Sequence, residues 1–264
     1  MKTFDNDLTP VLKLATNEEL DPLVGYITGA FSESLQYDAD YIEYSPDHQK
    51  YTDLIADEIK RFGGNTILNF FRGGGVSYYE VVVDVASRVG APYSKEDSIE
   101  EIENSILVSI MKKSWEKMDD DEKYAFIDEL GLSHSYKSIP KTFPIFAIQT
   151  IIANSGFLAY KLAAIIANQF AVFILGRGLS LASNIFLMRG MSIFAGPIVW
   201  TITGLWTVFE LAGPAYRVTL PCVIHIAMLR KQYAMEYCPK CENPYTSEMV
   251  FCPKCGHKLK KADK

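Results

Sequence analysis

The sequence has few charged residues in its second half and lacks the familiar catalytic motifs. Between Phe143 and Leu229 only five residues are Lys, Arg, Asp or Glu, although these types make up 22% of the whole chain. No zinc-protease, serine-hydrolase, P-loop or dinucleotide-binding motif is found, and the four histidines lie far apart in the sequence. We therefore predict a binding protein and not an enzyme.

The N-terminus has no apolar segment of the kind found in secretory signals. Residues 1–7 are polar, and no hydrophobic run followed by small residues comes after them. Cysteine is also scarce: four of the five cysteines form a metal-type pattern and only Cys222 is left over, which predicts a reducing compartment. We expect a cytoplasmic head, and we expect Cys222 to be a small buried hydrophobe and not a nucleophile.

Charge divides the chain into three regions. Residues 1–142 hold 14 basic and 27 acidic residues, residues 143–229 hold 4 and 1, and residues 230–264 hold 8 and 4. An acidic head is a poor surface for nucleic acid, whereas a mildly basic middle and end suit the anionic face of a bilayer. We therefore predict membrane lipid and either a protein partner or further copies of the chain as partners. Nucleic acid is a minor alternative, through the C-terminus.

The acidic head contains a series of predicted helices. They cover residues 8–15, a segment that opens with a capping box at 16–19, and residues 51–62, 66–72, 78–89, 98–117 and 119–130. Val81 to Val83 is a β-branched run that would suit a strand, but Tyr78, Val82, Val85 and Val89 repeat at helical spacing, so we favour a helix. We interpret residues 73–75, a triple glycine, as a helix-ending turn and not an anion loop.

The apolar region consists of uncharged runs separated by single ionisable residues. The runs cover residues 142–160, 162–176, 190–209 and 218–229. The first and third approach the roughly 20 residues that a membrane span needs, although Trp200 and Trp206 do not form an aromatic belt. Glu210 and Arg217 would share a helix face only if residues 213–214, a Gly-Pro pair, do not break the helix, and we expect them to break it. We favour a membrane-inserted hairpin or bundle; a buried soluble core, or a form that converts between the two, is the alternative.

Two CxxC pairs near the C-terminus predict a zinc site. Cys238 and Cys241 form the first pair, and Cys252 and Cys255 form the second after ten intervening residues. Each pair offers two sulfurs at the spacing that occupies two corners of a tetrahedron around one Zn²⁺ ion. Four thiolates close the coordination shell, so we expect a structural ribbon and no metal catalysis. His257 is interpreted as a bystander.

Three segments carry a family resemblance. They cover residues 5–28, 62–89 and 196–230, and the most distinctive parts are GGNTILNFFRGGG and GPAYRVTLP. These segments resemble the YaaW-type family of uncharacterised bacterial proteins, which is grouped with the ubiquinol-cytochrome c chaperone family. The resemblance implies a helical assembly factor and supplies no catalytic residues. It covers residues 1 to about 230, and the ribbon looks like an addition to the shorter members.

Together these observations predict an all-α protein in four parts. They are a short helical module (1–45), an acidic helical domain (46–140), an apolar membrane-associating region (141–230) and a zinc ribbon (236–258). The predicted function is membrane-associated interaction or assembly, at the bacterial inner membrane with the head and ribbon facing the cytoplasm. A pore-forming effector and a soluble, cytoplasmic chaperone for a respiratory membrane complex are the alternatives. The candidate polar contacts are Arg72, Glu80, Glu210 and Arg217.

Overall fold

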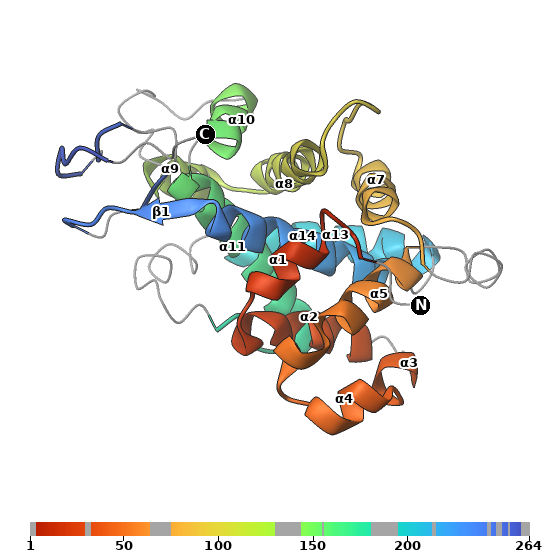
Figure 1. The fold of residues 1–264 in the computed structure, drawn as a ribbon. Coiled ribbons are helices and arrows are strands. Elements are labelled where there is room, and N and C mark those ends of the chain that lie inside the picture. The colour runs from red at the N-terminus through yellow and green to blue at the C-terminus, as the bar shows by residue number, and fades with distance from the viewer. Residues whose placement is uncertain are drawn as a thin grey trace.

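The computed structural model describes residues 4–29, 33–63, 75–129, 144–154, 156–180, 195–212, 215–241, 244–246, 250–252 and 254–259 (Figure 1). Most of these residues are helical, which confirms the predicted all-α class. The helices are α1 (Thr9–Leu14), α2 (Asn17–Gly29), α3 (Glu33–Gln36), α4 (Ala39–Tyr44), the 3-10 helix η1 (His48–Tyr51), α5 (Thr52–Phe62), α7 (Tyr78–Val89), α8 (Ile99–Trp115), α9 (Asp120–Glu129), α10 (Ile145–Asn154), α11 (Gly156–Leu175), α13 (Ala195–Ala212) and α14 (Tyr216–Tyr233). Strands β1 (Met235–Tyr237) and β2 (Pro244–Thr246) follow as an antiparallel pair.

The head helices begin and end close to the residues that the local sequence indicates. At the start of α2 the Thr16 N–H donates to the Glu19 carboxylate at 2.9 Å, and the Glu19 N–H donates to the Thr16 hydroxyl at 3.3 Å, which is the predicted capping box. Helix α7 contains the β-branched run and ends at Gly90, whose φ of 74° suits glycine. The helix expected at 66–72 lies outside the described residues.

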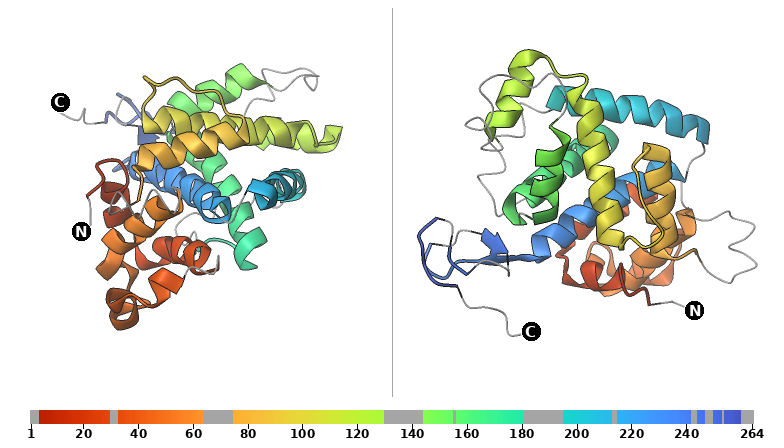
Figure 2. Two further views of the ribbon diagram at one scale, coloured as in Figure 1. Left: turned by 90° about the vertical axis from the view of Figure 1, so that its right-hand side faces the viewer. Right: turned by 90° about the horizontal axis from the view of Figure 1, so that it is seen from above.

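Helix α14 is the central element of the fold. It runs through the middle of the other helices in every view (Figures 1 and 2) and packs against α1, α2, α5, α7 and α8 of the head and against α11 and α13 of the apolar region. Nearly all of its side chains from Tyr216 to Leu229 are buried. A helix that is apolar all round must be enclosed by protein or by lipid, and here protein encloses it.

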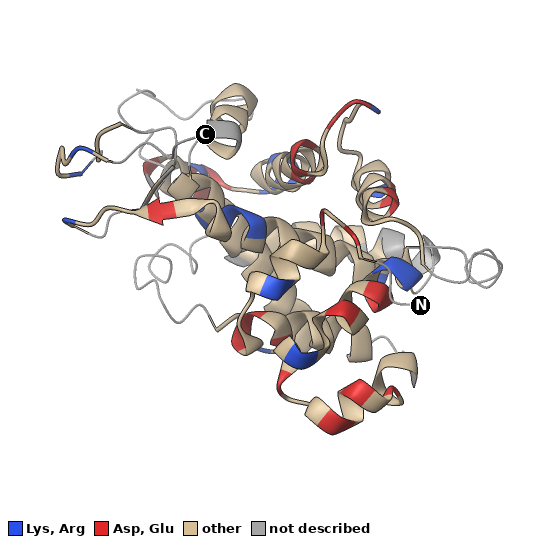
Figure 3. Cartoon of the chain, viewed as in Figure 1, with Lys and Arg blue, Asp and Glu red and all other residues tan. Residues whose placement is uncertain are grey.

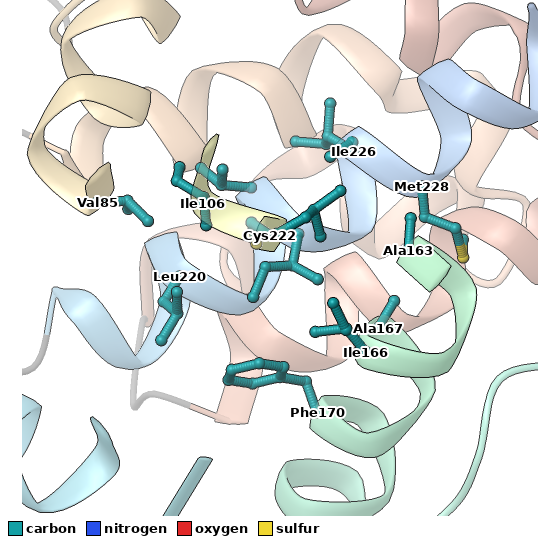
Figure 4. Close-up of a cluster of buried hydrophobic side chains, with 14 of the residues drawn as sticks. Val85, Ile106, Ala163, Ile166, Ala167, Phe170, Leu220, Cys222, Ile226 and Met228 are labelled. Atoms are coloured by element: carbon teal, nitrogen blue, oxygen red, sulfur yellow. The ribbon is translucent and has the colours of Figure 1, made fainter. Parts of the chain in front are cut away.

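One hydrophobic core therefore extends across the head and the apolar region. In Figure 4, Val85 of α7 and Ile106 of α8 approach Leu220 and Cys222 of α14 from one side, and α11 contributes Phe170 from the other. Cys222 is fully buried, as predicted. Small residues on α11 that face α14, among them Ala163 and Ala167, allow the two helices to approach closely. Figure 3 marks the charged residues along the chain; Glu103, Lys161 and Lys231 are among those that are buried.

Among the described residues, α11 is long and apolar enough to cross a membrane. Two-thirds of that stretch, 67%, is buried inside the protein, as is common for a core helix. Helix α13 ends at Ala212 and α14 begins at Tyr216, so Glu210 and Arg217 belong to separate helices, although residues 213–214 themselves lie outside the described part. Membrane insertion of this region stays a prediction.

A buried ion pair joins the head to α14. The Glu103 side chain on α8 is 1% exposed and accepts hydrogen bonds from Arg230 Nε at 2.9 Å and from the Tyr78 hydroxyl at 3.0 Å. Arg230 also donates to the carbonyl of Asp7 at 2.9 Å. Burial alone would lower the pKa of Arg230, but the Glu103 carboxylate raises it above its ordinary value. The pair therefore links α7, α8, α14 and the residues just before α1 through charge-assisted hydrogen bonds.

His225 is a core histidine on α14 whose protonation would destabilise the fold. Its Nε2–H donates to the carbonyl of Glu19 at 2.8 Å, and Nδ1 is buried with no partner among the described residues. Burial lowers its pKa to about 4, whereas an exposed histidine has a pKa near 6.5. Between these values the unfolded chain binds a proton that the folded chain does not, so stability is lost as pH falls from about 6.5 to about 4.

We expect His225→Gln to remove this part of the pH dependence. Replacing this histidine should make the loss of unfolding free energy between pH 7 and pH 4 smaller by about 3 kcal/mol. Urea unfolding at several pH values measures it. The control is His257→Gln, which removes a half-exposed histidine of the C-terminal ribbon. Parallel stability curves for the protein and His225→Gln would contradict the prediction.

Candidate metal centre

The four paired cysteines converge at one point in the C-terminal ribbon. Their sulfurs all lie within 4.8 Å of one another, with Cys238 Sγ 3.7 Å from Cys255 Sγ and Cys241 Sγ 3.6 Å from Cys252 Sγ. Zn–S bonds of about 2.3 Å in a tetrahedron place the sulfurs about 3.8 Å apart. The donor set and its spacing therefore fit a single zinc ion.

Local backbone structure prepares the second cysteine pair for a metal. The Gly256 N–H donates to the carbonyl of Cys252 at 2.9 Å, and Gly256 has a φ of 67°, which closes a tight turn. Burial raises the pKa of the Cys252 thiol, but hydrogen bonds from the N–H groups of Cys255 and Lys254 and from neighbouring thiols lower it to about 6. The thiolate, the form that binds metal, is thus favoured near neutral pH.

The ribbon is attached directly to the central helix. A single residue, Ala234, separates the end of α14 from β1. Met235, the first residue of β1, is buried in the main hydrophobic core and not in the small core of the ribbon, and β2 packs against α11. The ribbon and the helical body therefore share apolar contacts.

The candidate polar contacts occupy different parts of the chain. Glu80 lies in the first turn of α7, where its N–H donates to the Ser77 hydroxyl at 3.2 Å and caps the helix. Arg217 is half-buried at the start of α14. Arg72 and the side chain of Glu210 lie outside the described part of the structure. The role of these four residues as contacts stays a prediction.

The sequence reasoning missed the polar groups that join α7 to α14. Next to Arg217, the Tyr216 hydroxyl accepts a hydrogen bond from Arg88 Nε at 3.1 Å, and the Arg88 guanidinium lies 4.8 Å from the Tyr216 ring centre. Burial and a hydrogen bond with Asp84 raise the pKa of Tyr216. No motif marks contacts between residues this far apart, although two of the segments that carry the family resemblance, 62–89 and 196–230, contain these residues.

Comparisons with known proteins agree with this arrangement. A family model described as ubiquinol-cytochrome C chaperone matches residues 47–224, and a zinc-ribbon model matches residues 237–259. A UPF0174 protein of Helicobacter pylori (strain J99) is 37% identical over 232 residues, which cover 86% of this chain and 91% of the relative. The chain belongs to the UPF0174 family.

Further UPF0174 relatives extend the comparison to a second organism. The UPF0174 protein YaaW of Escherichia coli (strain K12) is 32% identical over 186 residues, which cover 70% of this chain and 73% of the relative. The resemblance inferred from the three sequence segments, including the grouping with the chaperone family, is thereby confirmed. So is the zinc ribbon. No solved structure matches this UPF0174 chain significantly.

We expect Cys252→Ala to abolish zinc binding and to leave the helical body folded. Metal binding supplies on the order of 10 kcal/mol of folding free energy to a ribbon of this size, so the β1–β2 pair should unfold. Loss of the Met235 contacts should lower the unfolding free energy of the body by about 2 kcal/mol. Elemental analysis and urea unfolding measure the two effects. The control, Cys222→Ala, should keep one zinc per chain. Retention of zinc by Cys252→Ala would contradict the assignment of Cys252 as a zinc ligand.

Proposed function

We propose that this protein is a membrane-associated assembly factor, a binding protein whose zinc ribbon is structural. The matched family model is described as a chaperone, and the names of the relatives state no reaction. The proposed zinc ligands are Cys238, Cys241, Cys252 and Cys255, which would close the coordination shell and leave no site for substrate. The proposed location is the bacterial inner membrane, with the head and ribbon on the cytoplasmic side.

The outer face of α13 is the observation that carries the proposal. Its inner face is buried through Ile198, Thr201 and Ile202. Its outer face presents Gly196, Val199, Trp200, Thr203, Gly204 and Thr207, none of which is ionisable. Trp200 is 67% exposed. A peripheral helix usually turns charged residues to water, and an uncharged outer face with an exposed tryptophan suits a membrane interface or an apolar client.

A cation lies beside this face. Lys117 Nζ donates to the carbonyl of Trp200 at 2.9 Å and lies near Gly204, whereas the Glu122 carboxylate lies near Gly196 at the start of the helix. An ammonium group next to an apolar helix face suits the anionic headgroups of a cytoplasmic leaflet, where each such charge adds about 1 kcal/mol. Arg72, Glu80, Glu210 and Arg217 are the proposed polar contacts to a partner.

A soluble assembly chaperone is the second candidate. It is favoured by the burial of most of α11, the described helix that is suited to span a bilayer. In that case the outer face of α13 would bind an apolar segment of a client, and the protein would be recovered free of membranes.

We expect Trp200→Ala to weaken binding to vesicles of phosphatidylethanolamine and phosphatidylglycerol by about tenfold, because removing an exposed indole from an apolar contact costs more than 1.4 kcal/mol. Co-sedimentation measures the bound fraction. Tyr37→Ala is the control, since Tyr37 is 74% exposed on the connection between α3 and α4.

Three other outcomes would point elsewhere. No binding of the unaltered protein to vesicles would favour the soluble chaperone. Equal binding by Trp200→Ala and the unaltered protein would contradict the role of the α13 face. Release of an entrapped dye at low protein concentration would favour the pore-forming alternative.

A further inference from the structure

A surface pocket of about 580 Å³ lies on the head, where the first turns of α2, the segment 44–48 and the residues after α11 meet. Its apolar walls include Pro22, Tyr44, Pro46 and Leu175. The volume is typical of sites that bind small organic molecules. The pocket contains no residue of α13 or of the ribbon, so it is independent of the proposed function.

A buried histidine is fixed at the wall of this pocket. The His48 side chain is 5% exposed, and its Nδ1 is 2.5 Å from the Tyr51 hydroxyl. Burial raises the pKa of Tyr51 to about 12. The hydroxyl and the ring nitrogen form a hydrogen bond that fixes the ring. His48 Nε2 lies 3.5 Å from Asp21 Oδ1, which is longer than a normal hydrogen bond. The ring therefore lies beside Asp21 at the wall of the pocket, with no hydrogen bond of normal length between them.

The pocket already holds a cation that belongs to the chain. Arg177, directly after the left-handed Gly176 at the end of α11, pairs with Asp21 Oδ2. The Arg177 side chain is 62% exposed, so water screens this pair and it contributes little to stability. A ligand can displace such a guanidinium at small cost.

The electrostatics of the pocket favour a positive ligand. Its lining contains the carboxylates of Glu18, Asp21 and Asp47 and one guanidinium, that of Arg177, so carboxylates outnumber guanidinium groups three to one. The C-terminal end of α11, a helix of 20 residues, lies at the pocket, and its dipole attracts cations. At the opposite end of the site, where α2 begins, the capping box pairs the N–H groups of Thr16 and Glu19 with side-chain oxygens. These two N–H groups therefore do not point unpaired at a cation.

We propose that this pocket binds a small organic cation. A protonated amine or guanidinium would sit among Asp21, Asp47 and Glu18, in competition with Arg177, and an apolar or aromatic body would lie against Tyr44 and Pro46. Contact of the cation with the Tyr44 ring would add a cation–π interaction. The same chemistry is offered by a free amine and by a lysine side chain of a protein partner.

The experiment compares matched probes on the full-length, zinc-loaded protein. Phenethylamine, its uncharged analogue 2-phenylethanol, its anionic analogue phenylacetate and N-acetyl-lysine amide are titrated by calorimetry or NMR. We expect phenethylamine or the lysine amide to bind best, and the tighter of the two identifies a free amine or a side chain as the source.

Two sets of substitutions in the pocket should change the affinity for the cation in opposite directions. Glu18→Gln combined with Asp47→Asn should weaken binding of the cation by about tenfold, and Arg177→Gln should strengthen it by about threefold to tenfold because it removes the competing charge. Trp200→Ala, which alters the α13 face, should leave the affinity for the cation unchanged. Equal binding of phenethylamine and 2-phenylethanol, a preference for phenylacetate, or weaker binding by Arg177→Gln would overturn the proposal.

Discussion

The enclosure of α14 by other helices is the constraint on which the rest of the structure depends. From Val218 to Leu229 this helix is buried all round, and in the described part of the structure helices of both the acidic head and the apolar region surround it. The Glu103–Arg230 pair also fixes how α8 and α14 align, since the buried Glu103 carboxylate loses its partner if the two helices shift. The head therefore also covers the apolar region.

The sequence predicted local structure well because local structure rests on neighbouring residues. The capping box at Thr16, the helical period through Val82 and Val85, and the paired cysteines all act within a few residues. The sequence alone does not show whether lipid or protein surrounds an apolar helix, because both environments favour similar apolar side chains. The contacts of Glu103 with Arg230 and of His48 with Asp21 join residues far apart in the chain, and no spacing rule reveals them.

The molecule presents three surfaces with different chemistry. The ribbon holds its cysteines at zinc spacing and is joined to α14 through Met235. The outer face of α13 is uncharged and carries Trp200. The pocket near His48 is acidic and lies on the head. In the proposed assembly role, the exposed apolar face of α13 would bind a partner while the core around α14 stays covered.

A double-mutant cycle on Glu103 and Arg230 tests the central claim most directly. Glu103→Gln, Arg230→Met and the double variant are compared by their free energies of unfolding. If α14 is enclosed by the head, Arg230→Met leaves the buried Glu103 carboxylate without its cation, and the coupling should be about 2 kcal/mol or more. Additive effects would mean that the two residues do not meet, and that α14 lies against something other than the acidic head.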